Sequence, residues 1–380
     1  MNKRIVIAVI SDLVTDQRVH KVALSLQQSG YDVLLIGARR KKSHALSPRA
    51  YPAKRINMLF QKGPLFYAEW NIRLFFKLAF MRADAITAND LDTLPAGFLA
   101  SGIKRCALVY DTHEYFTEME ELQGRKTVQR IWRWIERRLF KRVKHIYTVN
   151  DSIAGIYERL YGKKLVVVRN LPLRQNVVAA TPVFPENKIL LCQGAGLHSN
   201  RGLEELLLSL NYLPEEFTVT FAGSGLAINT LKQLSKDQHL EHRVHFTGLL
   251  PMEELATVTR NAFLGFSLDK PHSPNQLYSL PNKLFDYLAA GKPVVASNLP
   301  EVKKIVEGYK VGVVAPEVTP VAIADAVMQL AGNKETYLTF AANAAAAAKE
   351  LCWENERVKL VKLYHNVFER NTDERRFPRT

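Results

Sequence analysis

Short apolar runs alternate with amphipathic segments along almost the whole of this 380-residue chain. The runs are rich in β-branched residues and lack polar alternation, which is typical of strands buried on both faces. Strands that alternate with helices predict parallel, doubly wound sheets. The strand-like runs are, in order, RIVIAVI, DVLLIGA, ADAITAND, CALVYDTHE, HIYTVN, LVVVRN, ILLCQGAG, FTVTFAGSG, RVHFTG, AFLGFSL, PVVAS and VGVVAP.

The alternation is interrupted once, over residues 171–188, by a stretch that has three prolines and no clear periodicity. We interpret this stretch as a linker between two Rossmann-like domains that face a cleft. The predicted domains cover residues 1–170 and 188–355. Residues 356–380 are expected to form a helix that packs back on the first domain, followed by a frayed tail.

The composition, 47% apolar and 23% charged, is that of a globular protein, and no apolar run approaches the ~20 residues of a membrane-spanning helix. The apolar run near the start, Ile5 to Ile10, is shorter than the ~7–15 residues of a signal-peptide core, so we interpret it as a buried strand. The three cysteines, Cys106, Cys192 and Cys352, are far apart and suggest neither a disulfide framework nor a zinc site. We expect a cytoplasmic protein without a metal or a resident cofactor.

The net charge of +15 arises in the first half of the chain. Residues 1–170 hold 30 of the 52 Lys and Arg residues but only 15 of the 37 Asp and Glu residues. This asymmetry favours an anionic partner for that half: a membrane surface, a nucleic acid or a phosphorylated substrate. The alternative is a solvated basic face without a partner. Nucleic acid is not expected, because the basic residues form no known reading motif.

The basic residues are densest over residues 124–145, which hold nine Lys and Arg and one Glu. Either the apolar stripe of this predicted helix is core and its basic face is solvated, or the helix lies on an anionic membrane with Trp134 and Phe140 near the interface. The aromatic and basic segment 63–80 could belong to the same surface. The stripe consists of Val128, Ile131, Trp132, Ile135, Leu139 and Val143.

Polar residues follow several of the first-half strands, and ligands of doubly wound sheets bind beyond the carboxyl ends of strands. The loop after the first run has no G-x-G-x-x-G, which counts against a dinucleotide site, and Asp16 could equally cap the next helix. Asp92 is a possible N-cap after the third run. Three ionisable groups crowd the end of the fourth run, which favours a functional site. The candidates are Asp12, Asp16, Arg18, Asn89, Asp90, Asp111, His113 and Glu114.

Glycines follow the first two strands of the second half. Gly194 and Gly196 precede Arg201, which is expected at a helix start. Such glycines let backbone amides approach a phosphate, the helix N-terminus adds positive potential, and an arginine can bind phosphate with two hydrogen bonds. Gly223 and Gly225 repeat the pattern. The alternative is that these glycines only form tight turns.

The segment LYSLPNKLFDYLAAGKPVVAS predicts a loop, a short helix and a strand. Lys283 falls in the first helical turn, where a cation is normally disfavoured unless an anion binds there. With the amides of residues 278–280, it could hold a diphosphate. Asp286, one turn later, could accept hydrogen bonds from ribose hydroxyls. The alternative is an i,i+3 surface pair between Lys283 and Asp286.

The order of these motifs resembles that of the family 4 glycosyltransferases of the GT-B fold. The resemblance runs over about residues 3–365 through DQRVHKVALSLQQSGYDV, NDLDTLPAG, YDTHEYF, VNDSIA, RNLP, RGLEELL, FAGSG, HFTGLLPMEEL and LPNKLFDYLAAGKPVVASNLPEV. It implies a retaining, metal-independent transferase that moves a sugar from a nucleotide sugar to an acceptor. The second half would bind the donor and the first half the acceptor.

The resemblance also implies roles for individual residues. His113 would lie near the transferred sugar, and Arg201 and Lys283 would contact the diphosphate, so these three are the predicted catalytic residues. Donor binding would further involve Gly194, Gly196, Gly248, Leu249, Tyr278, Ser279, Leu280 and Asp286. Acceptor binding would involve Asp12, Asp16, Arg18, Asn89, Asp90 and Glu114.

The sequence departs from the family pattern at two places. Of the usual E-x7-E pair, the second acid is Asp286 and the first is replaced by Tyr278, which leaves the sugar open. Ala195 stands where a basic residue often follows the glycine. We expect a transferase of cell-envelope glycan biosynthesis, peripheral on the inner face of the membrane, with a lipid-linked or polysaccharide acceptor. The alternatives are a sugar-nucleotide epimerase and a non-catalytic scaffold that binds an anionic membrane or a nucleic acid. The Ala195 departure also leaves open a catalytically idle relative.

Overall fold

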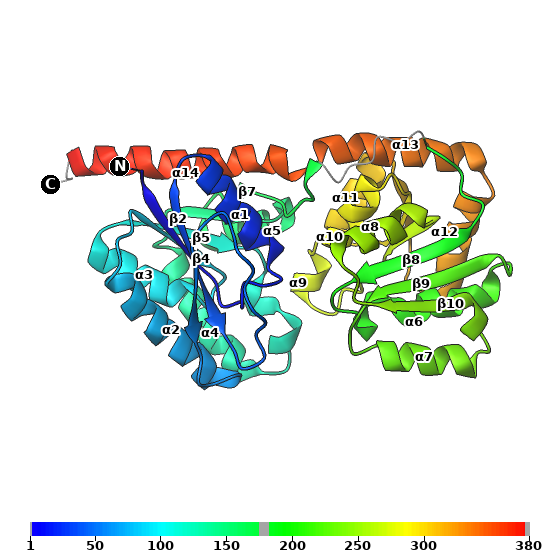
Figure 1. The fold of residues 1–380 in the computed structure, drawn as a ribbon, viewed down its shortest axis with the longest axis horizontal. Coiled ribbons are helices and arrows are strands. Elements are labelled where there is room, and N and C mark those ends of the chain that lie inside the picture. The colour runs from blue at the N-terminus through cyan, green and yellow to red at the C-terminus, as the bar shows by residue number, and fades with distance from the viewer. Residues whose placement is uncertain (1, 175–181, 377–380) are drawn as a thin grey trace. The chain divides into compact units, whose positions relative to one another are not determined.

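The computed structural model describes residues 2–174 and 182–376, with side chains described up to residue 369. The chain divides into two compact units, Met1–Asn170 with Glu356–Thr380, and Leu171–Asn355. Each unit contains one parallel sheet with helices on both of its faces (Figure 1). The prediction of two doubly wound α/β domains is therefore confirmed.

The sheet of the N-terminal unit has seven strands in the order β3-β2-β1-β4-β5-β6-β7, and every pairing is parallel. Ile5 to Ala8 of the first strand are completely buried, as the lack of polar alternation predicts. The strands are β1 (Arg4–Ala8), β2 (Asp32–Arg39), β3 (Ala53–Asn57), β4 (Ala85–Asn89), β5 (Ala107–Thr112), β6 (His145–Thr148) and β7 (Val166–Val167).

The helices of the N-terminal unit begin and end at recognisable signals. The Asn150 side chain caps α5 by accepting from the Ile153 amide, and Gly162, in the left-handed conformation, ends it. The helices are α1 (Gln17–Gln28), α2 (Gly63–Ala79), α3 (Leu94–Lys104), α4 (Lys126–Phe140) and α5 (Asp151–Tyr161). The last helix of the chain, α14 (Trp353–Arg376), also packs on this sheet, where the buried Tyr364 hydroxyl lies 2.6 Å from that of Thr87 in β4.

The sheet of the C-terminal unit has six strands in the order β10-β9-β8-β11-β12-β13, again all parallel. The strands are β8 (Lys188–Gly194), β9 (Phe217–Gly223), β10 (Val244–Gly248), β11 (Leu264–Ser267), β12 (Val294–Ser297) and β13 (Gly312–Ala315). The helices are α6 (Leu203–Leu208), α7 (Ile228–Asp237), α8 (Met252–Asn261), α9 (Pro274–Leu277), α10 (Asn282–Ala289), α11 (Pro300–Gly308), α12 (Pro320–Ala331) and α13 (Lys334–Glu350).

Several local predictions need correction. The edge strand β3 was not predicted, because its sequence AKRIN is mostly polar and only Ile56 is buried in it. The helix expected from Arg201 begins at Leu203. Asp92 does not cap α3, whose N-cap residue is Thr93. The linker prediction falls partly on residues 175–181 and the frayed tail includes residues 377–380, and both sets lie outside the described residues.

The buried face of α4 also differs from its prediction. Trp132, Glu136 and Phe140 are buried, whereas Ile131 of the predicted stripe is 53% exposed. Phe140 stacks on Tyr157 and Tyr161 of α5, so it belongs to the core and cannot lie at a membrane interface. Trp134 is 67% exposed, as the membrane interpretation requires.

Candidate functional site

The strand order reverses once in each sheet, and this point fixes where a ligand can bind. In the N-terminal unit the reversal lies between β1 and β4, and in the C-terminal unit between β8 and β11. Loops from the carboxyl ends of these strands diverge to opposite faces and leave a crevice. Many of the polar residues singled out from the sequence follow these strands or their neighbours, so each unit has a candidate site of its own.

In the C-terminal unit, Asp269 joins the two predicted phosphate-binding cations. Its Oδ2 lies 3.0 Å from Nζ of Lys283, and its Oδ1 lies 3.7 Å from Nε of Arg201. The Lys283 side chain is only 6% exposed, whereas that of Arg201 is 38% exposed. The ion pair that Lys283 forms is therefore with Asp269, not the surface pair with Asp286 considered above.

The backbone holds Arg201 and Asp269 close together. Gly202 adopts φ +65° and packs so tightly that a Cβ atom there would lie 2.7 Å from the backbone oxygen of Leu268. The Lys270 amide donates to the Asn200 carbonyl at 3.0 Å, and the Lys270 ammonium pairs with Glu205 at the start of α6. The loop after β11 is thus attached to the loop after β8.

Helix α10 carries Lys283 and Asp286 on successive turns. The Asp286 carboxylate accepts from Nε2 of Gln193 at 3.3 Å, and the Thr259 hydroxyl donates to Oε1 of the same glutamine at 2.7 Å. Gln193 is buried at the end of β8. This chain of hydrogen bonds orients Asp286, which is half-buried.

The backbone amides proposed for the phosphate are only partly suited to it. The amide of Tyr278 donates to the carbonyl of Pro274, and that of Ser279 donates to the carbonyl of Gln276. Both bonds close the C-terminal turn of α9, a helix that the sequence did not reveal. Of the three predicted amides, two are therefore already used within the chain, and Leu280 stays a prediction.

Of the four predicted glycines, two have backbone atoms at the place of a Cβ atom, and the other two lie near a basic side chain. A Cβ atom at Gly223 would lie 1.8 Å from the Gly194 carbonyl oxygen, and one at Gly225 would lie 2.1 Å from that of Leu197, so these two are required by packing. Gly194 faces the Arg201 guanidinium, with Nη1 at 3.9 Å from the Cβ position. Gly196 has His198 Nε2 at 3.1 Å from its Cβ position.

The predicted base contact follows β10. Gly248 has φ +70° with open space around its Cβ position, and the Leu249 side chain is 67% exposed. An exposed leucine can cover the face of a base, so both residues stay predictions for this contact.

The N-terminal unit gathers acids at the ends of β4 and β5. Asp90 adopts φ +61°, and its Oδ2 lies 3.1 Å from Nε2 of His113. Burial, followed by the neighbouring acids Glu114, Asp92 and Asp111, raises the pKa of Asp90 well above its usual value. Burial also raises the pKa of Glu114, and it raises that of Asp92 to about 7. Asp92 can therefore hold a proton near neutral pH, and all three carboxyl groups offer oxygens that can hydrogen-bond a polyol.

Arg18 is held in a buried ion pair of the N-terminal unit. Its Nε and Nη2 donate to Asp111 at 2.9 and 2.8 Å, and its Nη1 donates to the Val168 carbonyl at 3.1 Å. Arg18 is 4% exposed and Asp111 is completely buried. Burial opposes the charge of Arg18, but the paired Asp111 outweighs it and raises its pKa. Arg18 is therefore part of the buried framework of the unit, and its place in an acceptor pocket stays a prediction.

Three further acceptor candidates are engaged in the fold. Asp16 caps α1 by accepting from the Val19 amide at 3.1 Å, which is the alternative considered for it. Asp12 accepts from the Val14 amide at 3.0 Å in a local turn. Asn89 is buried and donates to the Ala8 carbonyl at 2.9 Å. Asp90, His113 and Glu114 lie with Asp92 at the ends of β4 and β5, and the acceptor-binding roles of all six predicted residues stay predictions.

Replacement of Asp92 by asparagine is expected to stabilise the protein more at pH 8 than at pH 5. The pKa of Asp92 rises from 3.8 to about 7 on folding, so between these values the folded state holds a proton that the unfolded state lacks. Stability consequently falls as pH rises through this window. The asparagine side chain does not titrate, so the variant does not lose this stability as pH rises. Each 1 kcal/mol gained corresponds to a shift of about 2–4 °C in melting temperature.

Thermal melts of both proteins at the two pH values test this expectation. The matched control is Asp32→Asn, which alters an aspartate that is 46% exposed. An equal effect of Asp92→Asn at both pH values would contradict the buried, protonated carboxyl.

Sequence reasoning missed Asp269 and Gln193. Asp269 gave no motif signal, although its position two residues after β11, at the switch point, would have identified it. Gln193 lies within a run that predicts a buried strand, so nothing marks it as a site residue. Among the described residues, no group of three or more His, Cys, Asp or Glu side chains could hold a metal ion.

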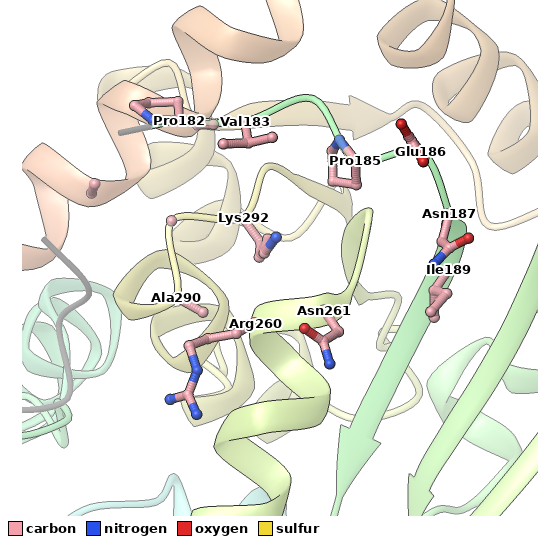
Figure 2. A pocket seen from close by; sticks show the side chains of 13 residues that line it. Pro182, Val183, Pro185, Glu186, Asn187, Ile189, Arg260, Asn261, Ala290 and Lys292 are labelled. Atoms are coloured by element: carbon pink, nitrogen blue, oxygen red, sulfur yellow. The ribbon is translucent and has the colours of Figure 1, made fainter. Parts of the chain in front are cut away.

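A separate cavity of about 660 Å³ lies at the amino ends of strands of the C-terminal sheet (Figure 2). Its lining includes Ile189 at the start of β8 and Lys292 just before β12. Arg260 and Asn261, at the end of α8, also line it. The Arg201–Lys283 cluster follows the carboxyl ends of the strands, so the cavity is distinct from it.

Two family models match the chain. That of the glycosyl transferases group 1 matches residues 177–347, and that of the glycosyltransferase family 4 matches residues 16–171. A D-inositol 3-phosphate glycosyltransferase from Corynebacterium urealyticum is 29% identical over 147 residues, 38% of this chain. The matched part spans only a third of that relative, 33% of its length.

Solved structures of low sequence identity share the fold. A sucrose-phosphate synthase from Thermosynechococcus elongatus superposes with a TM-score of 0.79 at 15% identity, covering 97% of this chain and 100% of the other. Anabaena HepE in complex with UDP and glucose superposes with a TM-score of 0.74 at 16% identity, covering 96% and 100%.

Proposed function

We propose, from the premise that this chain belongs to the family 4 glycosyltransferases of the GT-B fold, that it transfers a sugar from a nucleoside diphosphate donor to a hydroxyl group of an acceptor. The observation that carries the proposal is the pair of cations, Arg201 and Lys283, at the switch point of the C-terminal sheet. A relative of the same fold is described in complex with UDP and glucose.

The proposed chemistry relies on fixed charges. The bond between the anomeric carbon and the diphosphate breaks, the acceptor oxygen forms the new bond on the same face, and the acceptor proton passes to an oxygen of the departing diphosphate. Arg201 and Lys283 stabilise the negative charge that develops on the diphosphate, and one such contact contributes ~10²–10³ in rate. These two cations can take the part of a metal ion, so we propose metal-independent transfer. Asp286 holds the ribose in this scheme.

The acid cluster of the N-terminal unit supports a polyol acceptor. Asp90, Asp92 and Glu114 offer carboxyl oxygens, and His113 is oriented by its contact with Asp90. Such groups hydrogen-bond several sugar hydroxyls at once. We propose a glycan or lipid-linked glycan of the cell envelope as the acceptor, with His113 beside the reacting sugar.

A panel of UDP, GDP, ADP and their sugars tests the donor assignment by thermal shift and calorimetry. A ligand at 100 times its Kd is expected to stabilise the protein by ~2.7 kcal/mol. Release of the nucleoside diphosphate in the presence of a glycan acceptor then reports transfer. Failure of every nucleotide to bind would contradict the proposal, and an altered nucleotide sugar without transfer would indicate an epimerase.

The acceptor class is supported by a surface of the N-terminal unit that fits an anionic membrane. Helix α4 exposes Trp134, Ile131 and a row of basic residues that includes Arg137 and Arg138. Helix α2 exposes Leu65, Ile72 and Phe76. Apolar side chains among cations are the chemistry of an interfacial helix. No helix among the described residues is long and apolar enough to span a membrane, so we propose attachment from one side.

Replacement of Arg137 and Arg138 by glutamine is expected to weaken binding to vesicles of phosphatidylserine and phosphatidylcholine about 30-fold. Each basic residue near an anionic surface contributes ~1 kcal/mol, which is about five-fold in affinity. Co-sedimentation at physiological salt measures the change. Lys303→Gln with Lys310→Gln, on the electrically neutral C-terminal half, is the matched control. Equal binding of the starting protein to purely neutral vesicles would contradict an electrostatic contribution to membrane attachment.

A further inference from the structure

The Arg201–Lys283 cluster already contains an anion of its own. The two oxygens of Asp269 face the two cations separately, Oδ2 toward Lys283 at 3.0 Å and Oδ1 toward Arg201 at 3.7 Å. Two oxygens of a phosphate would make the same pair of contacts. We propose that the Asp269 carboxylate occupies the place of a donor phosphate in the nucleotide-free protein and must give up these cations when the diphosphate binds. This inference rests on the proposed function.

The charges of the cluster support an internal anion. Arg201 and Lys283 supply two positive charges, and Asp269 and Asp286 supply two negative charges, so the four groups together carry none. An incoming diphosphate therefore gains attraction only as a carboxylate moves away from its cation. Lys283 is 6% exposed, and a buried ammonium is stable only beside an anion. Asp269 supplies that anion until the ligand replaces it.

The local backbone shows that the carboxylate is built into the site. The close contact of Gly202 with Leu268 and the hydrogen bond from the Lys270 amide to the Asn200 carbonyl hold the loop on either side of Asp269. Displacement of the carboxylate is thus a rotation of the Asp269 side chain, not a movement of its loop. The exposed side of the cluster is that of Arg201, at 38%, which leaves the ligand a route to both cations.

The arrangement affects product and donor unequally. A free nucleoside diphosphate carries one more negative charge than its sugar ester, so it is repelled more strongly by Asp269. Asp269 therefore weakens the binding of the product more than that of the donor, and this favours product release. A residue that merely held Lys283 and Arg201 in position would instead strengthen the binding of both ligands.

The test compares the protein with its Asp269→Asn variant, using UDP, GDP, ADP and inorganic pyrophosphate as probes in calorimetry. The variant is expected to bind the preferred nucleoside diphosphate ~10-fold more tightly or better, with a smaller gain for the nucleotide sugar. Asp269→Glu, which keeps the charge, should resemble the starting protein more closely. Asp237→Asn, on the exposed side of α7 in the same unit, is the control.

Stability gives a second readout if Asp269→Asn folds poorly. The variant is expected to melt at a lower temperature than the starting protein and to be stabilised more by pyrophosphate, because the added anion replaces the lost carboxylate. Weaker or unchanged binding by Asp269→Asn, or no extra stabilisation by pyrophosphate, would overturn the inference while leaving the donor site intact. If no nucleotide or pyrophosphate bound to either protein, the proposed function would fail first, and this inference with it.

Discussion

Replacement of Lys283 by methionine is expected to weaken binding of the preferred nucleoside diphosphate by ~2 kcal/mol or more, which is about 30-fold. Lys283 is a buried cation at the first turn of α10, and the loss of a buried charge partner costs ~2–5 kcal/mol in binding. Turnover should fall by ~10²–10³, because the leaving diphosphate loses one of its two fixed cations. Calorimetry and nucleotide-release assays measure the two effects separately.

The control for Lys283 lies just beyond the other end of the same helix. Lys292→Met removes a partly buried lysine at the opposite edge of the sheet, beside the cavity of Figure 2, and should leave nucleotide binding unchanged. Lys283→Met also leaves Asp269 without its closest cation, so its stability should fall. The double variant Lys283→Met, Asp269→Asn removes that unpaired charge. Unimpaired nucleotide binding by a folded Lys283→Met protein would refute the donor site.

Replacement of Arg18 by methionine is expected to lower the free energy of unfolding of the N-terminal unit by ~3–5 kcal/mol. The change leaves Asp111, which is completely buried, without the guanidinium that contacts both of its oxygens. Urea denaturation followed by tryptophan fluorescence measures the loss, since Trp70, Trp132 and Trp134 all belong to this unit.

A double variant separates the ion pair from other effects. Arg18→Met with Asp111→Leu removes both charges, and most of the lost stability should return, because an apolar pair often replaces a buried ion pair at little cost. Nucleotide binding, which we assign to the other unit, should stay unchanged below the unfolding transition. If Arg18→Met were as stable as the starting protein but failed to use the acceptor, the original assignment of Arg18 to the acceptor pocket would stand.

The elements of both sheets were largely predictable from local patterns. A strand buried on both faces shows an unbroken apolar run, and a helix shows its buried stripe and its cap, as Asp16 and Asn150 do. The exceptions have local reasons. The edge strand β3 buries only one residue, so it leaves no apolar run in the sequence. Short α9 is likewise below the length at which periodicity appears.

The site was predictable in position and only partly in its members. The reversal of strand order indicates which loops can meet a ligand, and Arg201, Lys283 and Asp286 lie on or after such strands. What a charged side chain does there depends on its partner across the fold. Arg18 is paired with Asp111, which is 93 residues away, and Lys283 with Asp269. No local pattern records such a pairing.

The sequence by itself thus determined two doubly wound units, the strand ends that carry polar residues, and the family to which the chain is similar. Apolar periodicity and turn residues act over a few neighbours, and for that reason they can be read along the chain. The tertiary structure alone decided which charges are buried together. It assigned Arg18 to the core, brought Asp269 between two cations and raised the pKa of Asp92 to about 7, because burial and charge act through space between residues far apart in sequence.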